Sequence, residues 1–442
     1  MKIPQKPPDF GRVLSDDLKK YNDLASRVNQ KNEESEEIRK LIRKYNEQEY
    51  IHWDDLRRKK IPYDPTAFWY VIRTIRSTKY REIRIGDEKF PFYTPENFLK
   101  QLHLIDKASP ASFDWLFGEV PSKANKKQYL INSLMEEAIA SSQLEGAATT
   151  RPVAKKILRE GRKPKNIYEQ MIVNNYRTVL RLKDIRDKPL SKALILEIHG
   201  EITRDTMESV SDESDFRSCD VVVGDKVDPT KIYHYAPGCE KIPAMIDDLI
   251  AFTNNNEEFI HPIVKAIIIH FLIGYIHPFR DGNGRTARAL FYWFALKHHY
   301  DLLEYISISR IFLHAPVQYT RAYQLTETDG NDMTYFIDFN IHVITRALED
   351  LKKYIILKKE EEAESLQLVE EIPDLSFRQA EILRDFVRHP TRHYTISEIS
   401  GKYKISLPTA RTDLLLLESK GKLKKYKDGK RQIFIYKVGT RQ

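Results

Sequence analysis

One short segment of the chain, HPFRDGNGRTAR at residues 277–288, holds the side chains best suited to phosphate chemistry. A glycine-rich loop that enters a helix points backbone N–H groups outward, and the positive end of the helix dipole strengthens this anion site. Arg285 and Arg288 are three positions apart, so they share a helix face where each can bind phosphate oxygens through its planar fork. Asp281 is a hard oxygen ligand suited to a magnesium ion that bridges phosphates. His277 is expected to titrate near neutrality and is the candidate general base.

Two helices must hold this segment in place. The preceding run, residues 263–276, is almost wholly apolar and predicts a helix buried on nearly all sides. Pro278 ends that helix because it lacks an N–H group, the Gly-Asn-Gly step permits a turn, and a second helix is expected to resume at about Arg285. The same residues could simply cap two helices with solvated arginines, but the coincidence of so many suitable residue types favours a site.

At every specified position the segment resembles the signature of the Fic family, His-Pro-Phe-x-Asp/Glu-Gly-Asn-Gly-Arg-x-x-Arg. The resemblance extends to EAIASSQLEGAATT, FRSCDVVVGD and YAPGCEKIPAMIDDLIAF, and covers roughly half of the chain. It implies a mostly α fold, with a Fic-type helical bundle and a β-hairpin flap. It also implies AMPylation, the transfer of AMP from ATP to a Ser, Thr or Tyr hydroxyl of a target protein with release of pyrophosphate.

The resemblance assigns roles to individual residues. His277 would deprotonate the target hydroxyl, and Asp281 would hold Mg²⁺, the implied cofactor. Asn283 would reach the α-phosphate, and Phe279 would anchor the segment in the core. The remaining phosphate ligands are expected to be Gly282, Gly284, Arg285 and Arg288, with the two arginines on the outer phosphates. These roles agree with the physical argument, because phosphoryl-type transfers rely mostly on positioning and charge neutralisation.

A second motif, SSQLEG at residues 141–146, follows a helical pattern. Gly146 is suited to the position just after a helix, which places Glu145 in the last turn, where the helix dipole disfavours a carboxylate unless a cation compensates. The Fic resemblance extends to this motif, from Ser141 to Gly146, and implies an inhibitory helix whose Glu145 pairs with Arg288 and withholds it from the γ-phosphate. Two alternatives stay open: a solvated glutamate at a helix end, or a glutamate that orients water for the removal of AMP.

A strand-like interlude between residues 221 and 235 alternates apolar and polar positions around a Gly-Asp turn signal and predicts a hairpin. It resembles the Fic flap, which receives the target backbone as an added strand. The expected target-binding residues are Val221, Val222, Val223, Tyr233 and Tyr235. An ordinary surface hairpin remains an alternative, and the Tyr and His residues of the second strand are also compatible with packing beside adenine or in the core.

The C-terminal residues 373–442 hold 16 Lys and Arg against 7 Asp and Glu, so this segment carries the surplus of a chain whose net charge is +8. Three predicted helices and a basic hairpin resemble a winged helix-turn-helix. The expected DNA contacts are Thr409, Arg411 and Thr412 on the last helix and Lys424, Lys425, Lys430 and Arg431 on the wing. Protein docking is the alternative, and the four consecutive leucines at 414–417 are compatible with a homodimer.

A length of 442 residues predicts two or three domains. We expect an N-terminal helical region over residues 1–110, a Fic domain with the inhibitory helix and the flap over 111–355, and the winged helix-turn-helix over 373–442. The abundance of Leu, Ile, Lys and Glu with only 16 glycines favours helices.

Only two cysteines, Cys219 and Cys239, occur in the chain, which argues against a disulfide framework and for a reducing, cytoplasmic compartment. The N-terminus lacks an apolar export signal, and the run at 263–276 is too short and too polar to span a membrane.

These features predict a protein adenylyltransferase restrained by Glu145. Two rival functions remain: a DNA-binding transcriptional regulator whose Fic body senses nucleotide, and a hydrolase that removes AMP at the same site. Transfer of another nucleotide is also open, because the motif binds phosphates and not the base.

Overall fold

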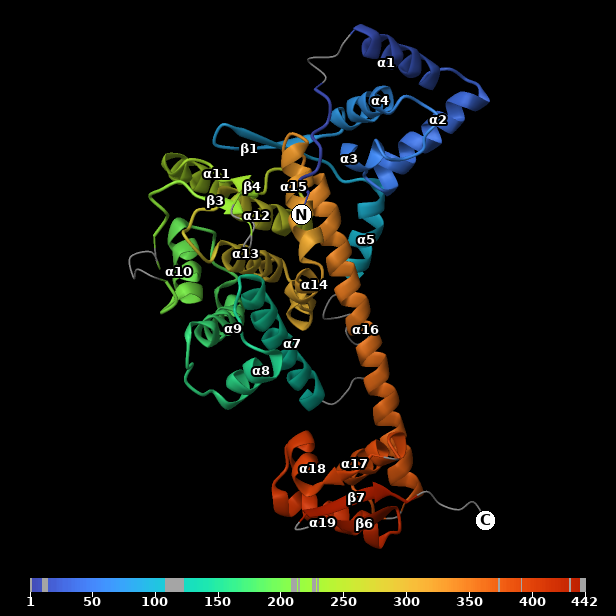
Figure 1. Cartoon of the computed structure of the whole chain (residues 1–442), viewed down its shortest axis with the longest axis vertical. Helices are drawn as coiled ribbons and strands as arrows, with labels where there is room; N and C mark the ends of the chain where they lie inside the picture. The colour runs from blue at the N-terminus through green and yellow to red at the C-terminus, as the bar shows by residue number, and fades with distance from the viewer. Residues whose placement is uncertain are drawn as a thin grey trace. The chain divides into compact units, whose positions relative to one another are not determined.

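The computed structural model of the chain describes residues 2–9, 15–107, 123–207, 213, 215–224, 228, 230–372, 374–390, 392–428 and 431–437 (Figure 1). The chain divides into two compact units, Met1–Leu351 and Lys352–Gln442. Helix α16 (Thr334–Glu371) begins in the first unit and ends in the second. Pro373, where we expected the domain boundary, lies outside the described residues.

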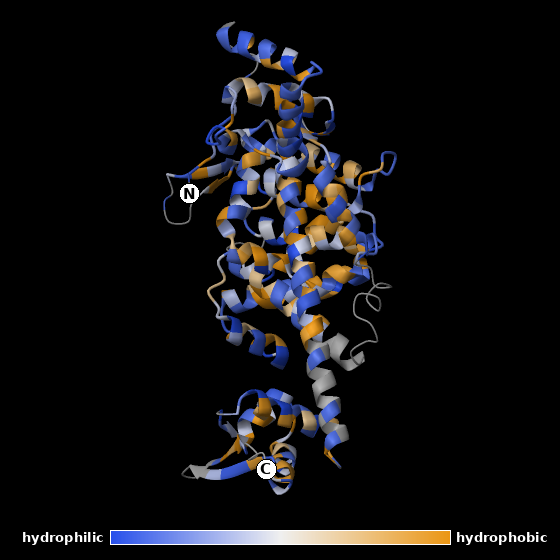
Figure 2. Ribbon diagram, turned by 90° about the vertical axis from the view of Figure 1, so that its right-hand side faces the viewer, coloured by the Kyte–Doolittle hydropathy of each residue, from blue (hydrophilic) through white to orange (hydrophobic). Residues whose placement is uncertain are grey.

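The first unit begins with a layer of helices. They are α1 (Ser15–Val28), α2 (Glu33–Arg43), a π-helical turn (Lys44–Gln48), α3 (Trp53–Leu56), α4 (Pro65–Ser77) and α5 (Glu96–Lys107). Helix α1 is mostly hydrophilic, and Figure 2 shows this end of the molecule in blue. Helix α4 supplies buried Phe68, Trp69 and Ile72 to the core of the layer. It begins at Asp64, whose carboxylate accepts hydrogen bonds from two N–H groups of the first turn.

A β-hairpin also lies in this N-terminal region, where we expected only helices and breaks. Strand β1 (Arg81–Ile85) pairs in antiparallel register with β2 (Glu88–Phe92). Ile83, Ile85 and Phe90 are buried while the charged residues between them are exposed, which is the period of two of a half-buried strand. Each strand has only five residues, so the alternation was too short to stand out in the sequence.

The helices that carry the predicted site form the body of the first unit (Figure 1). They are α7 (Lys123–Leu144), α8 (Arg151–Glu160), α9 (Ile167–Ile185), α10 (Lys192–Thr203), α11 (Ile242–Asn254), α12 (Pro262–Ile276), α13 (Asn283–Lys297), α14 (Ile308–His314), α15 (Pro316–Thr328) and the first part of α16. Short 3₁₀ turns at Cys239–Lys241 and Asp301–Tyr305 join some of them, and strands β3 (Val222–Gly224) and β4 (Ile232–Tyr235) form a hairpin.

Helix α12 lies at the centre of this bundle and is buried over nearly its whole length, as its apolar sequence predicted. Its two polar interior residues have partners. Lys265 donates from Nζ to the carbonyl oxygen of Asn255 at 2.6 Å, and Nε2 of His270 lies 2.9 Å from the hydroxyl of Tyr319. Helix α13 packs along α12, so the loop between them is held by two buried helices.

Buried polar contacts join the N-terminal layer to the bundle. Arg76 of α4 is fully buried and donates to Oδ1 of Asn46 at 2.8 Å and to the hydroxyl of Tyr335 at 2.9 Å. Arg73 forms ion pairs with Asp329 and Asp332 of the bundle. Buried charges require such partners, so these contacts fix the layer on the bundle as part of one compact unit.

The second unit contains the end of α16, three further helices and a three-stranded sheet. The elements are α17 (Phe377–Arg388), β5 (Tyr394–Thr395), α18 (Ile396–Tyr403), α19 (Leu407–Ser419), β6 (Leu423–Asp428) and β7 (Arg431–Tyr436), and the strand order is β5-β7-β6. Ser406 caps α19, and buried Asp413 of α19 pairs with Arg378 of α17. In the part of the chain that the structure describes, no helix combines the length and the apolarity needed to cross a membrane.

Candidate functional site

His277 is the residue at which α12 ends. Its backbone is left-handed, with φ 50° and ψ 55°, and its N–H group donates to the carbonyl oxygen of Ile273 at 3.0 Å. The α conformation is disfavoured for a residue that precedes a proline, and Pro278 therefore turns the chain out of the helix here. A residue with a side chain rarely adopts this conformation, and such strain concentrates at functional sites.

The ring of His277 is arranged to act as a base. Nδ1 lies 3.2 Å from the carbonyl oxygen of Gly274, which can only accept, so Nδ1 carries the proton and the lone pair lies on Nε2. Burial lowers the pKa of His277 to about 4, below the near-neutral value that we expected from sequence. The ring is therefore neutral at physiological pH, which is the form in which histidine accepts a proton.

Arg217, which sequence reasoning missed, ties the turn at His277 to the base of the flap. Its side chain is fully buried, and it donates to the carbonyl oxygens of His277 (2.8 Å), Cys219 (2.8 Å) and Pro237 (2.5 Å). Its own N–H group donates to the carbonyl oxygen of Pro278 at 2.9 Å. One side chain thus joins both ends of the hairpin to the strained residue. The only signal in the sequence was its place in the FRSCD segment.

His234, on strand β4, makes a second connection between the flap and α12. Its Nε2 lies 2.7 Å from the carbonyl oxygen of Tyr275, and its Nδ1 lies 2.8 Å from Oε2 of Glu327 on α15. The histidine is largely buried, so these contacts fix the second strand of the flap beside the end of α12.

The loop between the two helices is braced from within. Oδ1 of Asn283 accepts from the N–H of Phe279 at 2.9 Å, and its Nδ2 donates to the carbonyl oxygen of the same residue at 2.8 Å. These two bonds shape the loop, and the role of Asn283 at the α-phosphate stays a prediction. Phe279 is buried as predicted and stacks on His199 of α10, with ring centroids 3.6 Å apart.

The end of the loop is where we predict an anion site. Helix α13 begins at Asn283, two residues earlier than expected, after Gly282, whose φ of 81° favours glycine. Gly282 has no side chain with which to cap the first-turn N–H groups of α13. Arg285 is buried and donates from Nη2 to Oδ2 of Asp281 at 2.9 Å, while its buried Nε has no hydrogen-bond partner among the described residues. An unsatisfied cationic donor beside a helix N-terminus fits an anionic group.

Glu145 lies against the first turn of α13. Its Oε1 accepts from Nη2 of Arg288 at 2.9 Å, so the predicted ion pair is present. Arg288 is buried and also donates to the hydroxyl (2.8 Å) and the carbonyl oxygen (3.0 Å) of Ser141. A Cβ at Gly284 would lie only 2.1 Å from the same Oε1, so the carboxylate rests directly against α13. Gly146 has a φ of 101°, the conformation expected after the end of α7.

Residues 189–295 match the sequence model of the Fic/DOC family. These residues form a Fic domain. The chain is 29% identical to the protein adenylyltransferase Fic of Nematostella vectensis over 195 residues, which are 43% of each chain. It is 28% identical to the probable protein adenylyltransferase aq_aa38 of Aquifex aeolicus over 166 residues, 37% of this chain and 48% of that one. The chain therefore spans less than half the length of these curated relatives.

The fold of the Fic domain and its surroundings also resembles a solved structure. A fragment of Fic-1 from C. elegans superposes with a TM-score of 0.51 at 14% identity and covers 78% of this chain and 99% of that chain. The mostly helical Fic fold that we predicted is confirmed.

The flap of the Fic domain pairs Val222 with Tyr235 and Val223 with His234, with a register shift before Gly224. Val222 and Tyr235 are exposed, Tyr233 is half-buried, and Val221 immediately precedes β3. In the described part of the chain this sheet has only two strands, so each strand keeps an outer edge. Such an edge can accept an added strand, and the target-binding role of the flap stays a prediction.

The residues of the Fic domain fit a magnesium ion with ATP as substrate. Asp281 is half-exposed, and only its Oδ2 is bonded to Arg285. Mg²⁺ takes one or two carboxylates together with substrate phosphate oxygens, and a single reachable carboxylate beside an anion site meets that need.

The predicted DNA contacts of the second unit differ in exposure. Arg411, Thr412 and Lys424 are exposed, while Thr409 is half-buried with its hydroxyl 2.8 Å from that of Ser406. Lys425 forms an ion pair with Glu418 of α19. Lys430 lies outside the described residues, and Arg431 opens strand β7.

Proposed function

We propose that this protein transfers AMP from ATP to a hydroxyl group of a protein target and that Glu145 restrains the reaction. The observation that carries the proposal is the loop between α12 and α13, which begins with His277, its Nδ1 bonded to a carbonyl oxygen, and ends at the uncapped N-terminus of α13 with Arg285. It supplies a proton acceptor and an anion site within one loop. The names of the adenylyltransferase relatives support the same reaction.

In the proposed reaction Nε2 of His277 accepts the proton of the target hydroxyl. The hydroxyl oxygen bonds to the α-phosphorus of ATP while the bond from that phosphorus to the α–β bridging oxygen breaks. Pyrophosphate leaves, and the target carries AMP through a phosphodiester bond. The first-turn N–H groups of α13 and the guanidinium of Arg285 hold the phosphates, since such transfers depend on positioning and charge. Mg²⁺, held by Asp281, would neutralise further phosphate charge.

The restraint follows from the contacts of Arg288. Three of its hydrogen bonds go to Ser141 and Glu145, so this arginine is not available to the outer phosphate of ATP. The carboxylate against Gly284 also adds a negative charge where phosphate would bind. We infer that ATP binds in an unproductive pose until Glu145 moves. Assays of AMP transfer and of AMP removal with Glu145 variants test whether the same carboxylate also assists removal of AMP.

Incorporation of label from ATP labelled at the α-phosphate tests the proposal. We compare the wild type, Glu145→Gly, His277→Ala and the double variant, with magnesium, on the protein itself and on a cell lysate. Label that rises in Glu145→Gly and disappears in the double variant supports the proposal. ATP binding without labelling by any variant overturns it.

A second candidate function is nucleotide-sensing DNA binding. We infer a winged helix from the order of α17, β5, α18, α19, β6 and β7, which supports this candidate together with exposed Arg411 and Lys424. Lys424→Glu should leave AMP transfer unchanged and weaken binding of a DNA duplex. If the variant loses AMP transfer and no DNA binding is seen in the wild type, this candidate fails.

A further inference from the structure

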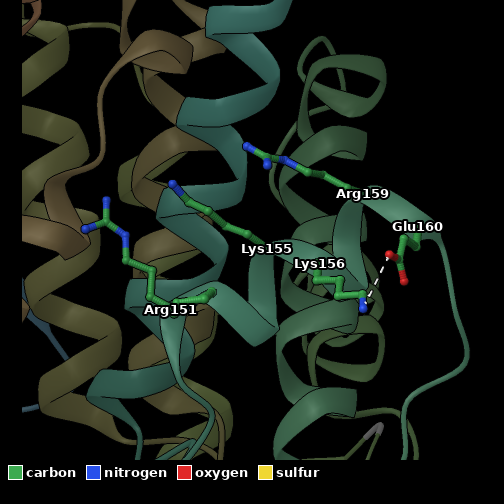
Figure 3. A pocket seen from close by; sticks show the side chains of 6 residues that line it. Arg151, Lys155, Lys156, Arg159 and Glu160 are labelled. Carbon is green, nitrogen blue, oxygen red and sulfur yellow. Dashed lines mark ion pairs between the residues drawn. The ribbon is translucent and has the colours of Figure 1, made fainter. Parts of the chain in front are cut away.

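A stretch rich in positive charge begins on α8, outside the predicted site. Residues 151–165, RPVAKKILREGRKPK, contain seven Lys and Arg and one Glu. A cavity of about 750 Å³ follows α8 and is lined by Arg151, Pro152, Lys155, Lys156, Arg159 and Glu160, which we name the α8 groove (Figure 3). A cationic concave surface attracts anionic partners.

Three cations of the α8 groove form a row. Arg151, Lys155 and Arg159 are four residues apart, so they share one face of the helix with a spacing of about 6 Å. Figure 3 shows them extending toward the same side of α8. That side faces α7, where Glu136 forms ion pairs with both Arg151 and Lys155. A single carboxylate is thus shared by two cations.

The third cation of the row has no acid opposite it. Arg159 faces Asn132 of α7, one helical turn before Glu136, and its Nη2 lies 3.4 Å from the neutral Oδ1 of that amide. Arg159 makes no ion pair with any described residue, and it is exposed. Lys156, beside the row, is 69% exposed and only 3.8 Å from exposed Glu160. The α8 groove therefore holds more positive than negative charge and already binds a carboxylate at one end.

We propose that the α8 groove binds an acidic segment of a protein partner through Arg159, Lys155 and Lys156. Alternate residues of an extended peptide are about 6.6 Å apart, which matches the row of cations, and guanidinium groups bind carboxylates through two donors. A helix of ten residues is about 15 Å long. This length suits a short peptide, whereas specific DNA interfaces bury about 1,000 Å² or more of protein surface.

Occupation of the groove would act on the SSQLEG segment (residues 141–146). Glu136 lies on α7 and Glu145 directly follows the last residue of that helix. The connector from there to α8 is held by a hydrogen bond of 2.8 Å from Nε2 of Gln143 to the carbonyl oxygen of Thr149. A partner carboxylate on Lys155 competes with Glu136 for this cation. The link between α7 and α8 then weakens, and residues 141–150 open more often.

Binding is tested with the full chain and a fluorescent oligoglutamate peptide, by anisotropy at low and at physiological salt. We expect binding that weakens as salt increases. The variant Lys156→Glu/Arg159→Glu should bind about tenfold more weakly, or about 1.4 kcal/mol, because it reverses two exposed charges without touching the pairs of Glu136. The control Lys59→Glu/Lys60→Glu reverses two exposed lysines elsewhere in the first unit. Thermal unfolding checks that both variants are folded.

Three results would overturn the binding proposal. The α8 variant could bind the peptide as tightly as the wild type does, or the Lys59→Glu/Lys60→Glu control could lose as much affinity as the α8 variant. Lys424→Glu of the second unit could also lose affinity for the peptide while the α8 variant keeps it. One further outcome would assign the groove to nucleic acid: the wild type binds a DNA duplex but not the peptide, and the α8 variant no longer binds the duplex.

The effect on residues 141–150 is tested by hydrogen exchange, which does not depend on the proposed function. The oligoglutamate should accelerate amide exchange in this segment of the wild type and leave the α8 variant unchanged. Equal exchange with and without bound peptide would contradict the coupling.

Discussion

The carboxylate of Glu145 lies 2.9 Å from Nη2 of Arg288, although the two residues are 143 positions apart in the chain. Arg288 belongs to the helix that begins at the anion site, and Glu145 follows the last residue of α7. The pair joins the element expected to bind phosphate to the element expected to restrain it. Removing Glu145 leaves buried Arg288 with an unsatisfied donor, which a phosphate can use.

Glu145→Gly is therefore expected to raise AMP transfer. The variant frees one N–H of Nη2 of Arg288, which still donates to the carbonyl oxygen of Ser141, and it removes a negative charge beside α13. We expect a rise of about tenfold or more, equivalent to about 1.4 kcal/mol in the barrier. The measurement is label incorporated from ATP labelled at the α-phosphate. Glu145→Gln keeps the size of the side chain and separates charge from bulk. Activity that stays at the wild-type level in both variants would show that Glu145 does not restrain the site.

His277→Ala should abolish the reaction while ATP still binds. Loss of a general base typically costs about 10²- to 10⁴-fold in rate, and the anion site of α13 remains intact in this variant. Single-turnover rates in the Glu145→Gly background, together with ATP titration by calorimetry, separate the two effects. A variant that transfers AMP at the parental rate would remove His277 from the mechanism.

The pH dependence should reflect the lowered pKa of His277. Its pKa is lowered to about 4 by burial, so the neutral, proton-accepting form persists below the ordinary value of 6.5. The rate should stay level as pH falls through 6.5 and should decline only toward pH 4. Because folding favours the neutral ring, its contribution to stability is present above pH 6.5 and is lost as pH falls toward 4. A rate that halves near pH 6.5 would contradict the assignment.

Arg217→Met should lower both stability and activity. The change leaves the carbonyl oxygens of His277, Cys219 and Pro237 without this donor, at a cost of about 1–3 kcal/mol for each that stays buried and unpaired. It also frees the turn that holds the ring of His277. Thermal unfolding and the rate of AMP transfer measure the two effects. Arg204→Met, at an exposed arginine of the first unit, is the matched control and should change neither.

Gly284→Ala should weaken ATP binding even in a variant that lacks Glu145. A methyl group there would lie 2.1 Å from Oε1 of Glu145 and 3.0 Å from Nη1 of Arg288. It would displace Glu145 but would also occupy the space that phosphate needs beside the helix. We expect weaker ATP binding and no gain of activity, alone or combined with Glu145→Gly. A double variant as active as Glu145→Gly would mean that phosphate does not approach Gly284.

Much of the fold and of the site could be predicted from local patterns. The apolar run of α12, the turn after Pro278 and the helix end at Gly146 follow from the preferences of neighbouring residues, and all three are present. The hairpin of β1 and β2 was not predicted, because strands of five residues are too short to show a clear alternation. Its stability comes from burial against the rest of the unit.

The sequence by itself determined which residue types stand at the site and in what order, from His277 to Arg288, because turns and helix faces are encoded over a few positions. Only the tertiary structure decided which atoms meet. It placed the proton of His277 on Nδ1, lowered its pKa by burial, engaged the amide of Asn283 within the loop and brought Arg217 beneath the flap. These properties depend on contacts between segments far apart in the chain, and packing alone sets them.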